Sequence, residues 1–157
     1  MKKTIILAAA MIAMASHSLF AQTDQGSWYV GASSNLNYTS GGGTSQTSLA
    51  VSAGNFVSDN FALGLSVAYQ NVDFGFGSQD QSVIGAFGRY YAGGNVILGA
   101  SLSTVSNGGG EVLGLEFGYA HFFNEHVSLE PTLNYSKSLA SGGGSATGLN
   151  LALGIYF

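Results

Sequence analysis

Large apolar residues alternate with small or polar residues along several stretches of the chain. The clearest is residues 61–69, where one face carries Phe61, Leu63, Leu65, Val67 and Tyr69. Residues 149–157 repeat the pattern, with Leu149, Leu151, Leu153, Ile155 and Phe157 against Asn150, Ala152, Gly154 and Tyr156. A period of two is typical of a β-strand whose two faces meet different surroundings. The pattern also predicts strands at residues 28–38, 96–102, 113–119 and 127–135, and less clearly at 47–57 and 82–91.

The connections between these eight stretches are of two alternating kinds. Three are short turns, at residues 58–60, 92–95 and 124–126, and four are longer, at residues 40–46, 71–80, 106–110 and 138–144. Outer-membrane barrels have short turns on the periplasmic side and longer loops outside. We therefore expect an all-β fold: an antiparallel up-and-down transmembrane β-barrel of eight strands, with both ends of the chain on the periplasmic side.

The chemistry of the two strand faces indicates which one meets lipid. The face with large side chains is free of charge, whereas the other carries small and polar residues together with Glu116 and Glu130. A soluble barrel such as a lipocalin has the reverse arrangement. Only 8% of the residues are charged, against about 25% in ordinary soluble domains. The sequence thus predicts a lipid-facing outer surface around a narrow polar interior, the lumen.

The N-terminal 21 residues have the pattern of a secretory signal peptide. Lys2 and Lys3 precede an apolar stretch over residues 4–15, which is too short to span a bilayer well. We expect cleavage after Ala21, which leaves residues 22–157 as the barrel domain. A cut after Ser18 is the alternative, because Leu19 stands where a small residue is preferred. An uncleaved membrane anchor is the rival interpretation of the same stretch.

Aromatic residues gather near the predicted strand ends. Rings with a polar tip suit the membrane–water interface, where the ring meets lipid and the tip meets water. We expect an aromatic girdle formed by Trp28, Tyr38, Phe61, Tyr69, Tyr90, Tyr91, Tyr135 and Phe157. The same reasoning places Phe56, Phe122 and Phe123 at the periplasmic rim.

Three motifs resemble the small outer-membrane β-barrel domain family, the porin-family barrels that include OmpA/OmpX-like eight-stranded members. They are residues 54–64 (GNFVSDNFALG), residues 87–91 (FGRYY) and the terminal Tyr156-Phe157. The first departs from the family at Asn55, where Tyr is usual, and lacks the Pro common just upstream. The resemblance implies a location in the cell outer membrane, and it implies that Tyr156 and Phe157 are read by the outer-membrane insertion machinery. Because such a family is defined by its fold, the resemblance implies little about activity.

Glu116 and Glu130 are candidate site residues, since they lie on the lumen faces of neighbouring predicted strands. Paired carboxylates are able to perform acid–base chemistry. We favour a polar network closed by Arg89, because the interior of an eight-stranded barrel is filled by side chains. Arg89 has a second interpretation. It shares a face with Phe87 and Tyr91, so strict alternation also allows it to point outward near the periplasmic rim and reach toward lipid headgroups.

Other kinds of site find little support in the sequence. His121 and His126 flank a turn without a metal-ligand motif, no spacing singles out a catalytic triad, and the glycine runs lack phosphate-loop spacing. Beyond residue 21 there are two basic residues, Arg89 and Lys137, against eight acidic ones, a formal charge of −6. Two basic side chains make no basic patch, which excludes a nucleic-acid partner. We expect no enzyme activity, no cofactor and no metal.

The sequence leaves three functions open. The leading interpretation is a monomeric outer-membrane barrel with a structural or surface role, whose partners are membrane lipids. The second is a narrow channel for water or small polar solutes, which the small residues of the lumen would line. The third is an adhesion or receptor barrel that acts through its external loops.

Overall fold

The computed structural model describes residues 23–37, 45–73, 78–106, 110–140 and 142–157. The expected signal peptide and Tyr38 lie outside these residues. The strands are β1 Trp28–Asn37, β2 Ser45–Ser58, β3 Phe61–Asp73, β4 Ser78–Ala92, β5 Val96–Val105, β6 Gly110–Tyr119, β7 His121–Asn124, β8 Val127–Ser138 and β9 Ser145–Tyr156. No helix among the described residues is long and apolar enough to cross a membrane.

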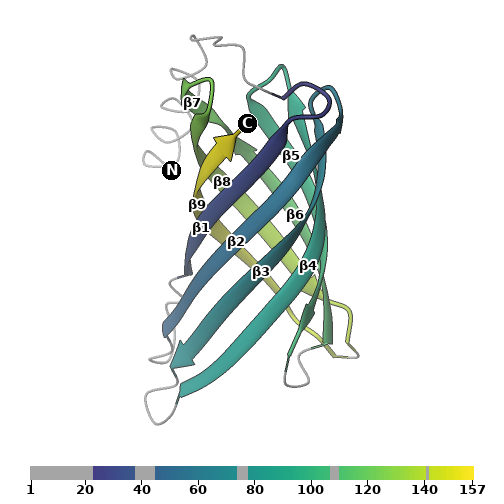
Figure 1. Ribbon diagram of the computed structural model, residues 1–157. Helices are drawn as coiled ribbons and strands as arrows, with labels where there is room; N and C mark the ends of the chain where they lie inside the picture. The colour runs from purple at the N-terminus through teal and green to yellow at the C-terminus, as the bar shows by residue number, and fades with distance from the viewer. Residues whose placement is uncertain (1–22, 38–44, 74–77, 107–109, 141) are drawn as a thin grey trace, which may run out of the picture.

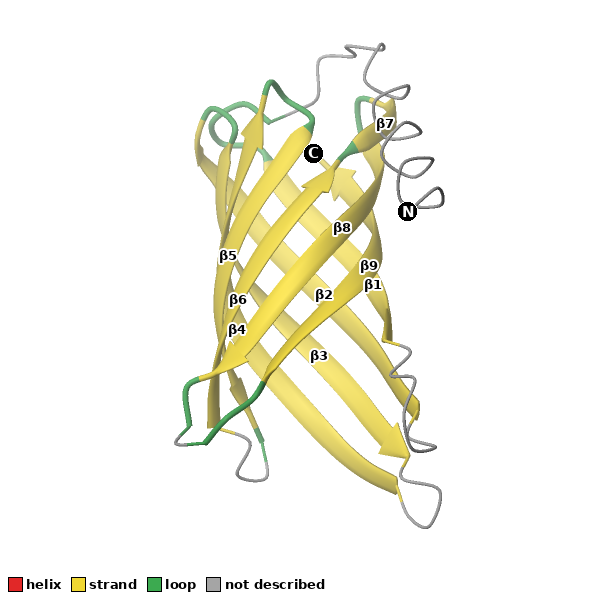
Figure 2. Ribbon diagram, turned by 180° about the vertical axis from the view of Figure 1, so that it is seen from behind, coloured by secondary structure: helices red, strands yellow, loops and turns green. Residues whose placement is uncertain are grey.

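The strands form one closed antiparallel barrel. Consecutive strands pair from β1 to β6, β8 pairs with both β6 and β7, and β9 pairs with β8 and returns to pair with β1. Figure 1 shows the first strand, in purple, beside the last, in yellow. The view from behind shows the tilted strands continuing around the other side (Figure 2). The predicted fold class and the pairing of the last strand with the first are confirmed.

Strands β6 and β7 are two parts of one physical strand, so the barrel has eight strands. The register is the same on both sides of the break: Gly118 pairs with Thr132, and His121 pairs with Leu129. The break lies opposite Pro131, whose missing N–H removes one hydrogen bond from the ladder. Ala120, at the break, instead donates its backbone N–H to the carbonyl of Asn95 at 2.7 Å.

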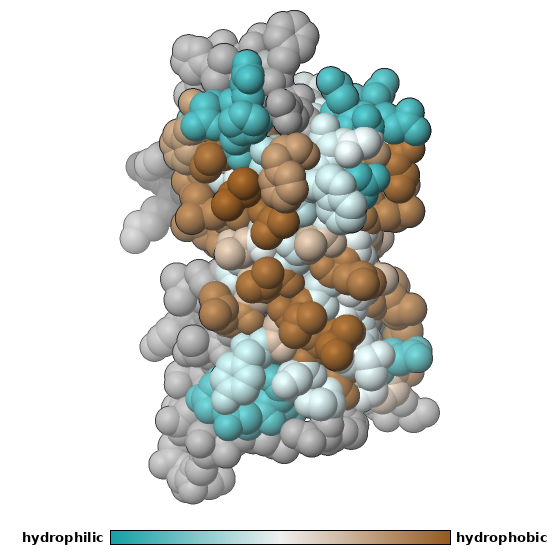
Figure 3. Space-filling view, viewed as in Figure 1, coloured by the Kyte–Doolittle hydropathy of each residue, from teal (hydrophilic) through white to brown (hydrophobic). Residues whose placement is uncertain are grey.

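The outer face carries the large apolar side chains, as the alternation predicts. Along β3, Leu63, Leu65 and Val67 are 48%, 68% and 56% exposed, while Ala62 is fully buried. The apolar side chains of β9 are exposed in the same way, with Leu151 and Leu153 at 51% and 53%. In Figure 3 brown side chains cover much of this face, and teal side chains gather toward its two ends. The outer surface is therefore apolar over the middle of the barrel and polar at its rims.

The two ends of the barrel differ. One, called the turn end, holds the three short turns and the C-terminus and is uppermost in Figure 1. At this end Asn60 takes a positive φ of 63°, a conformation that Asn tolerates better than most residues. The other, the loop end, extends further than the sequence predicts. Strands β3 and β4 continue to Asp73 and from Ser78, through the connection expected at residues 71–80, and the amide of Asn71 donates to Asp80 at 2.7 Å.

Candidate lumenal site

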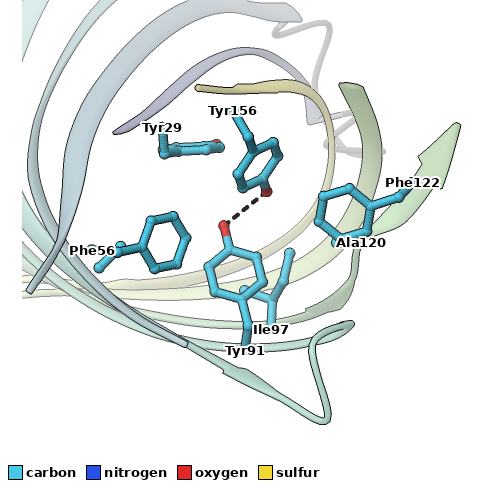
Figure 4. Packing of buried hydrophobic residues seen from close by; sticks show 8 residues of the cluster. Tyr29, Phe56, Tyr91, Ile97, Ala120, Phe122 and Tyr156 are labelled. Atoms are coloured by element: carbon cyan, nitrogen blue, oxygen red, sulfur yellow. Dashed lines mark hydrogen bonds between the residues drawn. The ribbon is translucent and has the colours of Figure 1, made fainter. Parts of the chain in front are cut away.

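The lumen at the turn end is filled by an apolar cluster, called the lumenal plug. Its members are Tyr29, Phe56, Ala62, Tyr91, Ile97, Ala120, Phe122 and Tyr156. All of them are fully buried except Phe122, which is 5% exposed. Figure 4 shows their rings converging on one another from different strands. The plug closes the cross-section of the lumen near the short turns.

Tyr156 is the centre of the plug. Its ring centroid lies 5.3 Å from that of Tyr29, 5.0 Å from Phe122 and 6.2 Å from Phe56. Its hydroxyl lies 3.1 Å from the hydroxyl of Tyr91, the contact drawn as a dashed line in Figure 4. Aromatic pairs at such distances contribute about 0.5–1.5 kcal/mol each beyond their burial. The penultimate residue of the chain therefore holds several strands together from inside.

Three aromatic residues predicted to belong to the girdle at the periplasmic rim lie inside the barrel instead. Tyr91, expected in the girdle, and Phe56 and Phe122, expected at the rim, are members of the plug, so those predictions are wrong. The physical reason is strand alternation, because Tyr91 shares the lumen face of β4 with Arg89. The other described girdle residues point outward; their exposed fractions are Trp28 52%, Tyr69 52%, Tyr90 46%, Tyr135 41% and Phe157 60%, with Phe61 partly buried.

Next to the plug, the structure brings together the three predicted polar residues, Arg89, Glu116 and Glu130, called the Arg89 network. Arg89 binds Glu116 through two parallel hydrogen bonds, from Nε to Oε2 and from Nη2 to Oε1, both 2.8 Å. Its Nη1 donates to Glu130 Oε2 at 2.8 Å and to the hydroxyl of Tyr29 at 2.6 Å. Arg89 therefore points into the lumen, and the outward orientation is wrong.

Glu130 is fully buried, yet its carboxylate is well supplied with donors. Oε1 accepts from Ser128 at 2.6 Å and from the hydroxyl of Tyr156 at 2.5 Å, in addition to the bond from Arg89 to Oε2. Buried charges are tolerated when they are paired and hydrogen-bonded in this way. The sequence alone did not predict that the hydroxyl groups of Ser128, Tyr29 and Tyr156 take part in this network. Their shared lumen-facing positions are the signal that would have found them.

Small residues make room for these long side chains. Arg89 lies between Ala62 on β3 and Gly99 on β5, its two cross-strand neighbours. A Cβ added at Gly99 would lie 2.9 Å from the carboxylate of Glu116, and one at Gly154 would contact Glu130. Gly99 and Gly154 therefore permit the close approach of the network to the barrel wall, where any larger residue would displace it.

On the loop side of the Arg89 network lies a cavity of about 390 Å³. Arg89, Glu116 and the ring of Phe87 lie at its inner end, and the hydroxyls of Ser52, Ser66, Ser101 and Ser103 are on its walls. The volume falls within the range of ligand pockets, roughly 300–1,000 Å³. The lumen thus consists of a packed turn-end half and a hollow half toward the loops, lined by both polar and apolar residues.

Comparison with solved structures finds a similar barrel. The N-terminal β-barrel domain of OprF from Pseudomonas aeruginosa matches with a TM-score of 0.55 and 15% identity, over 85% of this chain and 98% of that one. The chain shares the fold of that barrel domain. Neisserial surface protein A matches with a TM-score of 0.49 and 18% identity, over 83% of this chain and 96% of that one, too weak a likeness to carry an argument. Neither the protein-family models nor the curated proteins gave a match.

His121 and His126, the two histidines of the described residues, lie at the turn end, apart from the lumen. The His121 ring stacks edge-on against Phe123 at 5.3 Å, and His126 Nδ1 lies 2.9 Å from the carbonyl of Tyr156. Among the described residues, no three His, Cys, Asp or Glu side chains are placed to hold a metal ion. The charged groups that do meet inside the barrel are those of the Arg89 network.

Proposed function

We propose that the protein is an integral barrel of the cell outer membrane with a structural or surface role, without catalysis and without a continuous channel. The observation that carries the location is the apolar outer face. Residues such as Leu65, Leu102 and Leu153 are 50–68% exposed on three different strands. A water-soluble monomer rarely exposes large contiguous apolar patches, which mark contact with membranes or partners. A closed barrel suits lipid because it leaves no unpaired strand edge.

The lumenal plug supports a structural role over a channel. A solute that passes through the barrel would have to displace Tyr29, Tyr91 and Tyr156, all fully buried, and also cross the ion pairs of Arg89. Breaking a buried ion pair costs about 3–5 kcal/mol. The channel alternative is supported only by the loop-side cavity, which stops at Arg89 and Glu116.

Planar-bilayer recording tests this part of the proposal. The purified folded protein should give no steady unit conductance. The double variant Tyr91→Ala/Tyr156→Ala, which removes two rings from the plug, should give frequent openings and serves as the positive control. Steady conductance from the unchanged protein would refute the structural role and favour the channel.

The proposed location has its own test. The protein should fractionate with the outer membrane and begin at Gln22, or at Leu19 if the alternative cut after Ser18 is used. A soluble protein that retains Met1 would contradict both the export signal and the membrane location. The adhesion alternative depends on the connections at the loop end, much of which lies outside the described residues.

A further inference from the structure

The charged groups of the lumen do not balance. Arg89 supplies one positive charge, and Glu116 and Glu130 supply two negative charges when ionised, so the Arg89 network carries a net charge of −1. Arg89 is already used, since its three nitrogens donate to Glu116, Glu130 and Tyr29. The net negative charge lies in a lumen walled by protein and bordered by an apolar outer face, where electrostatic attraction is stronger than in bulk water.

Of the two carboxylates, the one accessible from the cavity on the loop side is that of Glu116. Glu130 is sealed by the lumenal plug, with no exposed side-chain surface, whereas the side chain of Glu116 keeps 15% of its surface exposed. Among the described residues that line the cavity, Arg89 is the only basic residue and Glu116 the only acidic one. A ligand in the cavity therefore contacts the carboxylate of Glu116, whose positive partner, Arg89, is shared with Glu130.

The cavity wall also holds a hydrogen-bond acceptor that lacks a donor. Asn150, on β9, lines the cavity, and its side-chain oxygen is buried without a hydrogen-bond partner in the part of the chain that the structure describes. An unpaired buried acceptor destabilises the protein, and an N–H group of a ligand would supply the missing hydrogen bond. Asn134 also lines the cavity and pairs directly with Glu116 across β6 and β8. Its amide nitrogen already donates to Thr132 at 3.2 Å.

We propose that the loop-side cavity is a binding site for a small organic amine. A protonated amine supplies one positive charge and up to three N–H donors in a compact group. Its charge neutralises the excess on Glu116, its N–H groups reach the unpaired oxygen of Asn150, and the serine hydroxyls on the wall accept the rest. Anions are repelled by the same excess charge, and an apolar ligand would leave the buried oxygen of Asn150 without a donor.

The test is calorimetric titration of the folded barrel in neutral detergent with butane-1,4-diamine, at constant ionic strength. Butane-1,4-diol has the same length without charge, and potassium chloride supplies a cation without N–H donors. We expect the diamine to bind measurably and the diol and potassium not to bind. Glu116→Gln should weaken diamine binding about tenfold or more, equivalent to ~1.4 kcal/mol. Glu111→Gln removes the same charge from an exposed position on the same strand and should leave the affinity within about twofold.

A second variant guards against misfolding of Glu116→Gln. Asn150→Leu removes an acceptor that has no partner in the described structure, so it should leave the barrel as stable as before or more stable, yet weaken diamine binding several-fold. Heat-modifiable gel migration verifies folding of each variant. No diamine binding to the unchanged protein, equal binding of the diol, equal competition by potassium, or unchanged binding to Asn150→Leu would each overturn the proposal. Membrane location and conductance do not enter this measurement, so its outcome is separate from that of the proposed function.

Discussion

Replacing Arg89 by Met is the most direct test of how the lumen is held together. Met has a similar unbranched stem but carries no charge and donates no hydrogen bond. The variant leaves Glu130, which is fully buried, and Glu116 facing each other without a cation. Removing one partner of a buried ion pair costs about 3–5 kcal/mol. Since whole domains are stable by only about 5–15 kcal/mol, we expect the variant to lose a large part of its stability.

The measurement is an equilibrium urea titration of the barrel in lipid vesicles, followed by the fluorescence of Trp28. Trp28 is the only tryptophan and is 52% exposed on the outer face near the turn end, so its emission reports transfer between lipid and water. Lys137→Met is the matched control, because Lys137 is an exposed residue on β8. Surface substitutions of this kind change stability by about 0.5 kcal/mol or less.

A third variant separates lost charge balance from lost packing. Arg89→Met combined with Glu116→Gln and Glu130→Gln removes all three charges, and replacing a whole buried ionic group is often close to neutral. We expect the triple variant to recover most of the stability that Arg89→Met loses. If Arg89→Met is no less stable than Lys137→Met, or if the triple variant recovers nothing, the electrostatic account of the network is wrong.

Two further predictions concern the outer face and the closure of the barrel. Leu65→Arg should lower the free energy of unfolding by about 2–4 kcal/mol in the same titration if Leu65 lies near the bilayer midplane. Leu139→Arg, just beyond the end of β8, should lower it by about 1 kcal/mol or less. Equal losses would contradict the depth assigned to Leu65. Deleting Tyr156 and Phe157 removes the centre of the lumenal plug and the two backbone hydrogen bonds between Phe157 and Trp28, at 2.6 and 3.0 Å. The barrel should then fail to close, and the difference in gel migration between unheated and heated protein, which marks a folded barrel, should disappear. Gly144→Asp, in open space at the loop end, should keep the shift, and a normal shift after the deletion would refute the closure argument.

Most of the fold was predictable because successive residues of a strand point to opposite faces, so large apolar residues alternate with small or polar ones when the two faces meet different surroundings. Leu65 and Ser66 are neighbours in the chain and point to opposite sides, so the period gives the strand and the face of each residue and limits the register to shifts of two residues. The short turns then set the order of the strands. The ends of β3 and β4 were harder to predict, because beyond the apolar belt both faces meet water and the alternation fades. The pairing of Asn71 with Asp80 extends the hairpin there.

The interior was predictable in its residue types and less so in its geometry. Glu116 and Glu130 group together because they lie on the lumen faces of neighbouring predicted strands, and Arg89 is the cation that closes the predicted network. Tyr91 was misplaced because an aromatic residue at a strand end was read by its type, which suits the interface, and not by its place in the alternation. Following the alternation from Arg89 would have put both residues inside. Sequence spacing alone gives no distance across the lumen, so the hydrogen bond from Tyr156 to Glu130 was not foreseen.

The two halves of the lumen follow from one constraint. The strands enclose a fixed cross-section, so a long side chain fits only where small residues face it. At the turn end, Gly99 and Gly154 leave space for Glu116 and Glu130, and the aromatic rings fill the remainder. Toward the loops many lumen-facing residues are small, such as Ser66, Ser103 and Gly114, so the side chains do not fill the cross-section and a cavity remains. The barrel is therefore closed on one side by packing and ion pairing and hollow on the other. Solutes can approach the charge on Glu116 only from the loop end, which is why a one-sided binding site accords with this lumen better than a passage through it.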